Sequence, residues 1–170
     1  LFRRPPFQCQ LVHFQQLIKE NKYISFTERK TPLYPSYRPM YKVAQILLIL
    51  HYNGYAGKAS LLKLHLFSWA MKSYENMNSL KEFVTSNYEQ KLHFFGIEST
   101  LNRALNLAYA EKLIDFENGS YKLLEKGKLF AGQLIEDETL FVNEKQVLQL
   151  VGKKIPERII NNLVNHWNNA

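Results

Sequence analysis

The sequence contains a single cysteine, Cys9, which excludes an internal disulfide framework and suits a reducing compartment. Long apolar runs are also lacking. The longest, Ile46 to Leu50, is far shorter than the roughly 20 residues needed to span a bilayer. We therefore expect a cytoplasmic protein without a membrane segment. The first residue is Leu1 rather than Met, so we expect that the native start is trimmed or missing.

A phosphate-binding loop is not predicted. The segment Gly54 to Ser60 reads GYAGKAS, but only two residues separate its glycines, and Ala59 intervenes between the lysine and the serine. A P-loop needs four residues between the glycines and a hydroxyl directly after the lysine. We interpret the segment as a junction between two helices, with Lys58 at a helix start.

Patterns that would indicate a catalytic or metal site are equally scarce. None of the five histidines has the spacing of a metal ligand, and His65, four residues before Trp69, is interpreted as a core or interface histidine. Cys9 lies in an alternating apolar stretch and is interpreted as a small buried residue. The acidic triplet Glu136–Glu138 fits a solvated loop. We therefore expect no enzyme activity, no metal and no cofactor.

Charge is distributed unevenly along the chain. Residues 1–60 contain nine Lys/Arg and two Glu, a net charge of +7, whereas residues 61–170 contain thirteen of each sign. A basic surface of this kind can bind nucleic acid or an acidic protein. The whole basic excess therefore lies in the first third of the sequence.

Apolar residues at helical spacing predominate from Met40 onward, which predicts a mainly α (α+β) fold. The expected helices are a first one from Met40 to the glycines at 54 and 57, then Lys58–Tyr74, Ser79–Thr85 with Asn78 as its cap, Gly96–Lys112 with Ser99 as its cap, Glu125–Ile135, Asn143–Leu150 and Pro156–Trp167. The segment Lys58–Tyr74 is apolar on most sides, so we expect it to be the central, most buried helix. In the Glu125–Ile135 helix, the residues expected to face inward are Leu129, Phe130 and Leu134.

Residues 97–126 have the pattern of the second half of a winged helix. An amphipathic helix is followed by strands Leu113–Phe116 and Ser120–Leu123, joined at Asn118-Gly119, a strong type I′ hairpin signal. The residues expected on the inner face of the helix are Leu101, Ala104, Leu105 and Ala108. We expect an arm with short strands and a proline-rich loop over 1–39, a winged-helix domain over 40–136 with its hairpin at about 113–124, and C-terminal helices over 137–170 packed on it.

The outer surface of this predicted winged helix is nearly neutral. Its candidate recognition residues are Asn102, Arg103 and Asn106 of the helix and Lys122 of the hairpin. Asn and Arg can read base edges, but Glu98, Glu111, Asp115 and Glu117 lie beside them and would repel phosphates, which dominate DNA affinity. We favour a protein-facing or architectural role and keep DNA reading as the alternative.

Cationic and aromatic residues are interleaved in the first 60 residues. The candidate partner or nucleic-acid contacts are Arg3, Arg4, Arg29, Lys30, Tyr34, Tyr37, Arg38, Lys58 and Lys63. Such a set can hold a nucleic-acid backbone or dock an acidic protein. A solvated basic face is the third interpretation.

Two strings carry a resemblance to a known family. They are RP-x-YK-x-x-Q-I-L-L-I-L, from Arg38, and KASL-x-K-L-H-L-F-x-W-A, from Lys58. With the predicted winged helix they resemble the middle component of bacterial three-component ABC systems, and are most similar to the small third subunit of Lamassu anti-phage systems. The resemblance covers about residues 5–165.

The resemblance implies a role in an assembly. In such systems an SMC-like ATPase hydrolyses ATP and senses DNA, an effector nuclease does the damage, and the small subunit bridges or regulates the two. We therefore expect a non-catalytic accessory subunit that meets DNA through the complex. The alternative is a transcriptional regulator that binds DNA through the winged helix. The two strings are not catalytic motifs, so no active-site residue is carried over.

Overall fold

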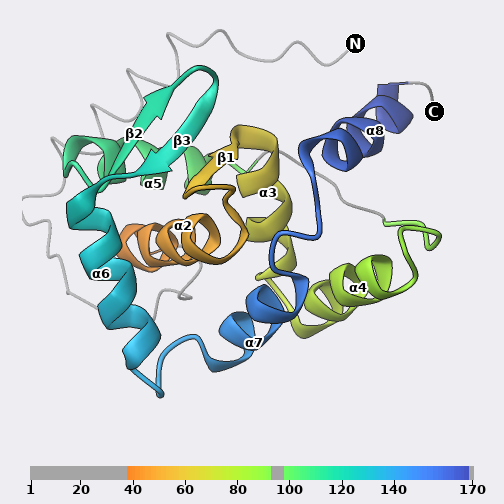
Figure 1. The fold of residues 1–170 in the computed structure, drawn as a ribbon, viewed down its shortest axis with the longest axis horizontal. Coiled ribbons are helices and arrows are strands. Elements are labelled where there is room, and N and C mark those ends of the chain that lie inside the picture. Colours follow the sequence, from red (N-terminus) through yellow and green to blue (C-terminus); the bar gives the residue numbers. More distant parts are fainter. Residues whose placement is uncertain (1–37, 93–97, 169–170) are drawn as a thin grey trace, which may run out of the picture. The chain divides into compact units, whose positions relative to one another are not determined.

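The computed structural model describes residues 38–92 and 98–168 (Figure 1). They form a mainly helical α+β fold, as the sequence predicts, with seven helices and one three-stranded antiparallel sheet. The helices are α2 (Pro39–Asn53), α3 (Leu61–Ala70), α4 (Tyr74–Thr85), α5 (Ser99–Ala110), α6 (Glu125–Glu136), α7 (Val142–Val151) and α8 (Glu157–Asn168). The strands are β1 (Lys58–Ser60), β2 (Ile114–Glu117) and β3 (Ser120–Leu123), in the order β1-β3-β2. Among these helices, none is long and apolar enough to cross a membrane. The strands predicted for the arm lie outside the described residues.

Helix α2 is buried on every side. No residue from Lys42 to Leu50 is more than 6% exposed, and α2 contacts α3, α5, α6, α7 and the sheet (Figure 1). Pro39 fits the first turn, where its missing N–H costs nothing. The central helix is therefore α2, and the prediction that Lys58–Tyr74 occupies this place is wrong.

The segment Lys58–Tyr74 is not one helix. Its first three residues form β1, whose backbone pairs with β3, Ala59 lying opposite Tyr121. Ser60 then caps α3, since its hydroxyl accepts a hydrogen bond from the Lys63 N–H at 3.1 Å. Helical spacing of side chains continues through β1, but the pairing with a distant strand overrides it.

Helix α4 begins earlier than the sequence suggests. Its cap is Ser73, which accepts a hydrogen bond from the Asn76 N–H at 3.2 Å. The helix therefore starts at Tyr74, and the predictions of a start at Ser79 and a cap at Asn78 are wrong. A serine two residues before the acidic Glu75 was the local signal for this start.

Helix α5 confirms the predicted inner face. Its buried residues are Leu101, Ala104, Leu105 and Ala108. The helix begins at Ser99, with Glu98 in the cap position, so the prediction that Ser99 is the cap is wrong. It ends before Lys112, whose φ of 54° lies in the left-handed region.

The hairpin between β2 and β3 has the predicted turn. Asn118 and Gly119 both have positive φ, 51° and 75°, as a type I′ turn requires. In the resulting register Asp115 lies opposite Lys122. Side chains alternate across the sheet, so Lys122 shares a face with the two acidic residues of β2.

Helix α6 confirms two of its three predicted inward residues, since Leu134 is buried and Phe130 packs against the core, but the prediction for Leu129 is wrong. Ala131 and Leu134 are buried, but Leu129 is 73% exposed. The buried face follows positions 127, 131 and 134, and Leu129 lies about 200° around the helix from Gly127. Gly127 packs directly against the backbone of Leu113, which fixes this rotation of the helix.

The C-terminal helices α7 and α8 are close to their predicted bounds. Tyr41 of α2 holds α7 in place: its ring centroid is 4.8 Å from that of Phe141, and its hydroxyl donates to Glu144 Oε1 at 3.1 Å. Burial and the Glu144 carboxylate raise the pKa of Tyr41 to about 12. The C-terminal segment is thus packed on the domain that α2 organises.

The two glycines of α6 test its rotation, because alanine should have opposite effects at them. A Cβ at position 127 would collide with the Leu113 backbone, whereas one at Gly132 meets nothing within 4 Å. We expect Gly127→Ala to destabilise the fold by about 1–3 kcal/mol and Gly132→Ala to stabilise it by about 0.8–1 kcal/mol. Urea unfolding measures both, and equal shifts would contradict this packing.

Candidate functional site

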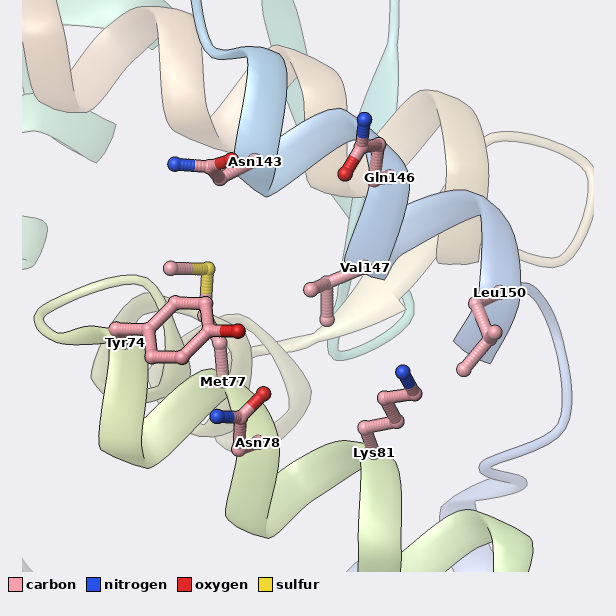
Figure 2. Close-up of a pocket in the computed structure, with 8 residues that line it drawn as sticks. All are labelled: Tyr74, Met77, Asn78, Lys81, Asn143, Gln146, Val147 and Leu150. Carbon is pink, nitrogen blue, oxygen red and sulfur yellow. The ribbon is translucent and has the colours of Figure 1, made fainter.

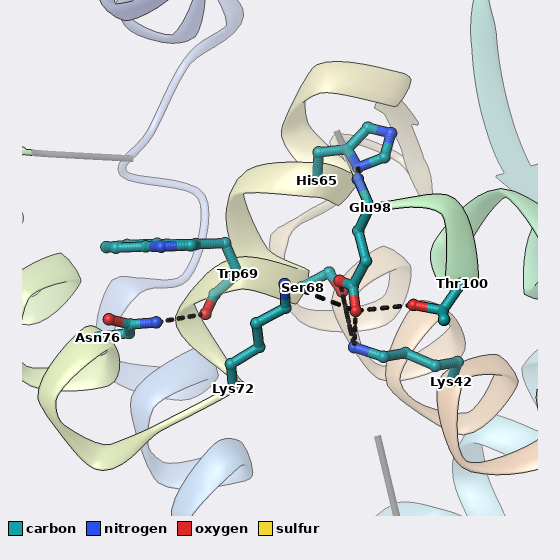
Figure 3. Close-up of polar contacts among 8 residues, drawn as sticks. All are labelled: Lys42, His65, Ser68, Trp69, Lys72, Asn76, Glu98 and Thr100. Atoms are coloured by element: carbon teal, nitrogen blue, oxygen red, sulfur yellow. Dashed lines mark hydrogen bonds and ion pairs between the residues drawn. The ribbon is translucent and has the colours of Figure 1, made fainter. Parts of the chain in front are cut away.

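A buried polar cluster joins α2, α3 and the start of α5 (Figure 3). Its members, which we call the Glu98 cluster, are Lys42, His65, Ser68, Lys72, Glu98 and Thr100. One carboxylate oxygen of Glu98 accepts from Ser68 Oγ at 2.7 Å, and the other accepts from Thr100 Oγ1 at 2.8 Å. Lys42 Nζ lies 3.2 Å from Glu98 Oε1 and donates to Ser68 Oγ at 3.0 Å. Every polar atom of the Glu98 side chain is therefore bonded.

His65 orients the residue that begins α5. It is buried, and its Nδ1 accepts a hydrogen bond from the backbone N–H of Glu98 at 3.1 Å. This bond requires an unprotonated Nδ1. Burial lowers the pKa of His65, and the nearby Glu98 carboxylate offsets this only in part. His65 is thus a neutral core histidine; within the described ranges no group of three His, Cys, Asp or Glu could hold a metal.

The geometry of Ser68 and Lys42 invites comparison with a catalytic pair. A lysine whose pKa is lowered by burial, donating to a serine hydroxyl, can act in nucleophilic catalysis. Ser68, however, is fully buried and its hydroxyl donates to Glu98. A substrate has no access to it, so the contact is structural.

The charged groups of the Glu98 cluster stabilise one another. Burial would raise the pKa of Glu98, but hydrogen bonds from Ser68 and Thr100 and the charges of Lys42 and Lys72 outweigh it and hold the pKa below its usual range. Glu98 is therefore ionised opposite the Lys42 ammonium. Such a pair is costly to break from one side, because the remaining charge stays buried.

Two further buried lysines fasten the C-terminal segment. Lys63 of α3 donates to the carbonyl oxygen of Ile155 at 2.9 Å, and Lys145 of α7 donates to the carbonyl oxygen of Asp137. Lys63 is only 4% exposed. The prediction that Lys63 contacts a partner is therefore wrong, since an apolar environment and a backbone acceptor hold it inside.

The exposed lysines of the sheet are neutralised within the sheet. Lys122 Nζ lies 2.6 Å from Glu117 Oε2 and 3.8 Å from Asp115 Oδ2, and Lys58 Nζ lies 3.7 Å from the same Glu117 oxygen. The two lysines and two carboxylates share one face of the sheet. Their summed charge is zero, so this face has little attraction for phosphate.

The outer face of α5 is exposed, as predicted. Asn102, Arg103 and Asn106 all lie on it. Arg103 forms no ion pair with any residue that the structure describes. The four candidate recognition residues include two cations. Arg103 is unpaired within the described residues, whereas Lys122 is paired.

The remaining candidate contacts are only partly placed. Arg38 is exposed directly before α2, and Lys58 is exposed but paired with Glu117. The candidates that lie outside the described residues are Arg3, Arg4, Arg29, Lys30, Tyr34 and Tyr37.

A shallow groove of about 240 Å³ runs between α4 and α7 (Figure 2). Met77 and Val147 form its apolar floor, and Lys81 reaches in from α4. No sequence pattern indicates this groove, because its two walls are about 70 residues apart.

In comparisons with known proteins, the chain matches no family model, no curated protein and no solved structure.

The Glu98 cluster predicts a specific pattern of stability changes. Glu98→Gln leaves the buried Lys42 charge unpaired, so we expect a loss of about 3 kcal/mol in unfolding free energy. Adding Lys42→Met to this variant removes that charge, and the double variant should recover part of the loss. Chemical denaturation measures both. Lys128→Gln breaks an exposed pair and should cost at most about 0.5 kcal/mol; a similar cost for Glu98→Gln would contradict the cluster.

His65 predicts a separate dependence of stability on pH. Because its folded pKa is lowered, its contribution is fully present above the unfolded value of about 6.5 and is lost as pH falls through the folded value. The pKa of Glu98 is also lowered, but its titration changes stability only below about pH 4.3. In His65→Asn, an amide oxygen can replace Nδ1 without titrating, so stability should vary less between pH 6.5 and 5. Thermal unfolding at several pH values is the measurement, and an unchanged pH profile in this variant would count against the assignment.

Proposed function

We propose that the domain is a winged helix. The order α2-β1-α3-α5-β2-β3, with a sheet ordered β1-β3-β2, supports this interpretation. In that scheme α5 takes the recognition position and the β2–β3 hairpin is the wing. Helix α4 is then an insertion before the recognition helix, and α6 to α8 are additions after the wing.

We propose further that the chain is a non-catalytic accessory subunit of a cytoplasmic bacterial anti-phage complex. It bridges or regulates an SMC-like ATPase and an effector nuclease, and DNA reaches it through the complex. The resemblance of the two strings that begin at Arg38 and Lys58 motivates the choice of system. Assembly is the mechanism: the domain holds the two partners together, and DNA sensing by the ATPase releases the effector.

The observation that carries this proposal is the neutralisation of the sheet's lysines by carboxylates of the sheet itself. Lys58 and Lys122 are paired with carboxylates of β2, so a DNA backbone would have to displace existing ion pairs. Helix α5 and strand β2 also expose aromatic side chains, Tyr109 (55%) and Phe116 (52%). Tyr, Phe and Arg are the residues favoured at protein interfaces, and Arg103 completes that set.

A transcriptional regulator is the second candidate. The exposure of Asn102, Arg103 and Asn106 on the α5 face favours it, because Asn and Arg are the side chains that read adenine and guanine. It requires nanomolar, sequence-selective binding by the chain alone, lost on Asn102→Ala or Arg103→Ala.

A tagged pull-down from the native host decides between these candidates. We expect a large coiled-coil ATPase to remain bound through about 300–500 mM salt, a range that strips phosphate-driven binding. Because the interface would be apolar at its centre, Tyr109→Ala with Phe116→Ala should reduce recovery about tenfold or more, the loss that about 1.4 kcal/mol gives. Leu129→Ala, which removes an even more exposed apolar side chain from α6, is the control. Recovery of the chain alone, with DNA lost as salt rises, would overturn the accessory role.

A further inference from the structure

The loop between α7 and α8 is fastened to the edge of the sheet at β1. Lys63 Nζ donates to the Ile155 carbonyl at 2.9 Å, and Ser60 Oγ donates to Glu157 Oε2 at 2.6 Å. The Ser60 N–H donates to Glu157 Oε1 at 3.3 Å, and the Tyr88 hydroxyl donates to the carbonyl of Lys154. The loop is therefore a fixed surface beside β1.

This loop and the first turn of α8 present cations that form no ion pair within the described residues. Lys153, Lys154 and Arg158 are all exposed, and none forms an ion pair with a residue that the structure describes. The one acidic residue among them, Glu157, is directed to Ser60. Lys58 of β1 and Lys122 of β3 have the opposite arrangement, since each is already paired with a carboxylate of β2.

An exposed aromatic ring lies beside one of these cations, Lys153. Tyr55, in the turn that joins α2 to β1, is 80% exposed, and Lys153 Nζ lies 5.9 Å from its ring centroid. The turn is held by a hydrogen bond from the Lys58 N–H to the Tyr55 carbonyl at 3.0 Å. The ring is thus presented on an ordered turn with a cation on one side and solvent over most of its area.

We propose that Tyr55, Lys153, Lys154 and Arg158 form a binding surface for single-stranded nucleic acid. The three cations would hold successive phosphates, and the free face of the Tyr55 ring would stack on a base. An acidic protein segment would use the cations but has no base to stack on the ring. This inference goes beyond the accessory role, because it gives the chain itself a direct nucleic-acid contact on a surface separate from the α5 face.

Salt-dependent binding of the full chain to a fluorescein-labelled oligothymidine of about 20 nucleotides tests the cations. In Lys153→Gln with Lys154→Gln, two phosphate contacts are removed, so the slope of log K against log salt should fall by about 1.4. The control is Lys126→Gln with Lys128→Gln, which lowers the net charge equally but removes lysines already paired on α6. The control should keep the wild-type slope.

Tyr55 variants test the stacking part of the proposal. Tyr55→Ala should weaken binding by about 5- to 150-fold, the range for loss of one base–aromatic stack, whereas Tyr55→Phe should bind like the wild type. Because Tyr55 is exposed, both variants should keep the wild-type thermal unfolding midpoint.

Three results would overturn the proposal. The first is an equal loss of affinity in the Lys126/Lys128 control. The second is unchanged binding by Tyr55→Ala together with competition by polyglutamate as strong as that by unlabelled oligothymidine, which would assign the surface to an acidic protein. The third is binding to a duplex of the same length as tight as to the single strand. None of these measurements involves an ATPase partner, so failure here and failure of the pull-down are distinguishable.

Discussion

The buried charge of Lys42 is the constraint on which the arrangement of helices depends. An ammonium group that is 1% exposed must meet an acceptor, since burying it alone costs several kcal/mol. Glu98 supplies the countercharge from the start of α5, and Ser68 supplies a hydroxyl from α3. Rotating any of the three helices by one residue would separate these groups. A polar interaction thus sets the relative rotation of α2, α3 and α5, which hydrophobic packing alone would leave less specific.

Local patterns predicted the elements whose structure is decided locally. The inner face of α5 follows from four apolar residues at helical spacing, and the hairpin follows from Asn118-Gly119. The start of α4 was missed although Ser73 signals it locally, but other errors lie where distant residues intervene. Lys58–Ser60 continues a helical pattern, but its backbone pairs with β3 and forms a strand. Leu129 is exposed because Gly127 packs against the start of the hairpin. Lys42 and Glu98 are 56 residues apart, so no motif could have joined them.

The same long-range pairing changes the meaning of the net charge. The described ranges contain sixteen Lys/Arg and thirteen Asp/Glu, but three of the lysines, Lys42, Lys63 and Lys145, are buried. Lys42 bonds the side chains of Ser68 and Glu98, whereas Lys63 and Lys145 bond backbone carbonyls. All three therefore contribute little to the surface. A count of charges along the sequence therefore overstates the basic surface of this part of the chain. The count also gives the wrong location for the basic surface. Within the described residues Lys58 and Lys122 are paired with carboxylates, whereas Lys153 and Lys154 are not.

This division of charge falls on opposite edges of one sheet. β2, at one edge, contacts α5 and supplies the carboxylates that neutralise Lys122 and Lys58. β1, at the other edge, receives the loop of Lys153 and Lys154 through Ser60 and Glu157. The neutralised lysines beside β2 have little attraction for a polyanion, whereas the cations beside β1 and Tyr55 suit one. Because both edge strands pair with β3, the two edges are held in a fixed relation. A subunit that bridges partners needs such a relation, since binding at one edge can then restrict where the ligand of the other edge lies.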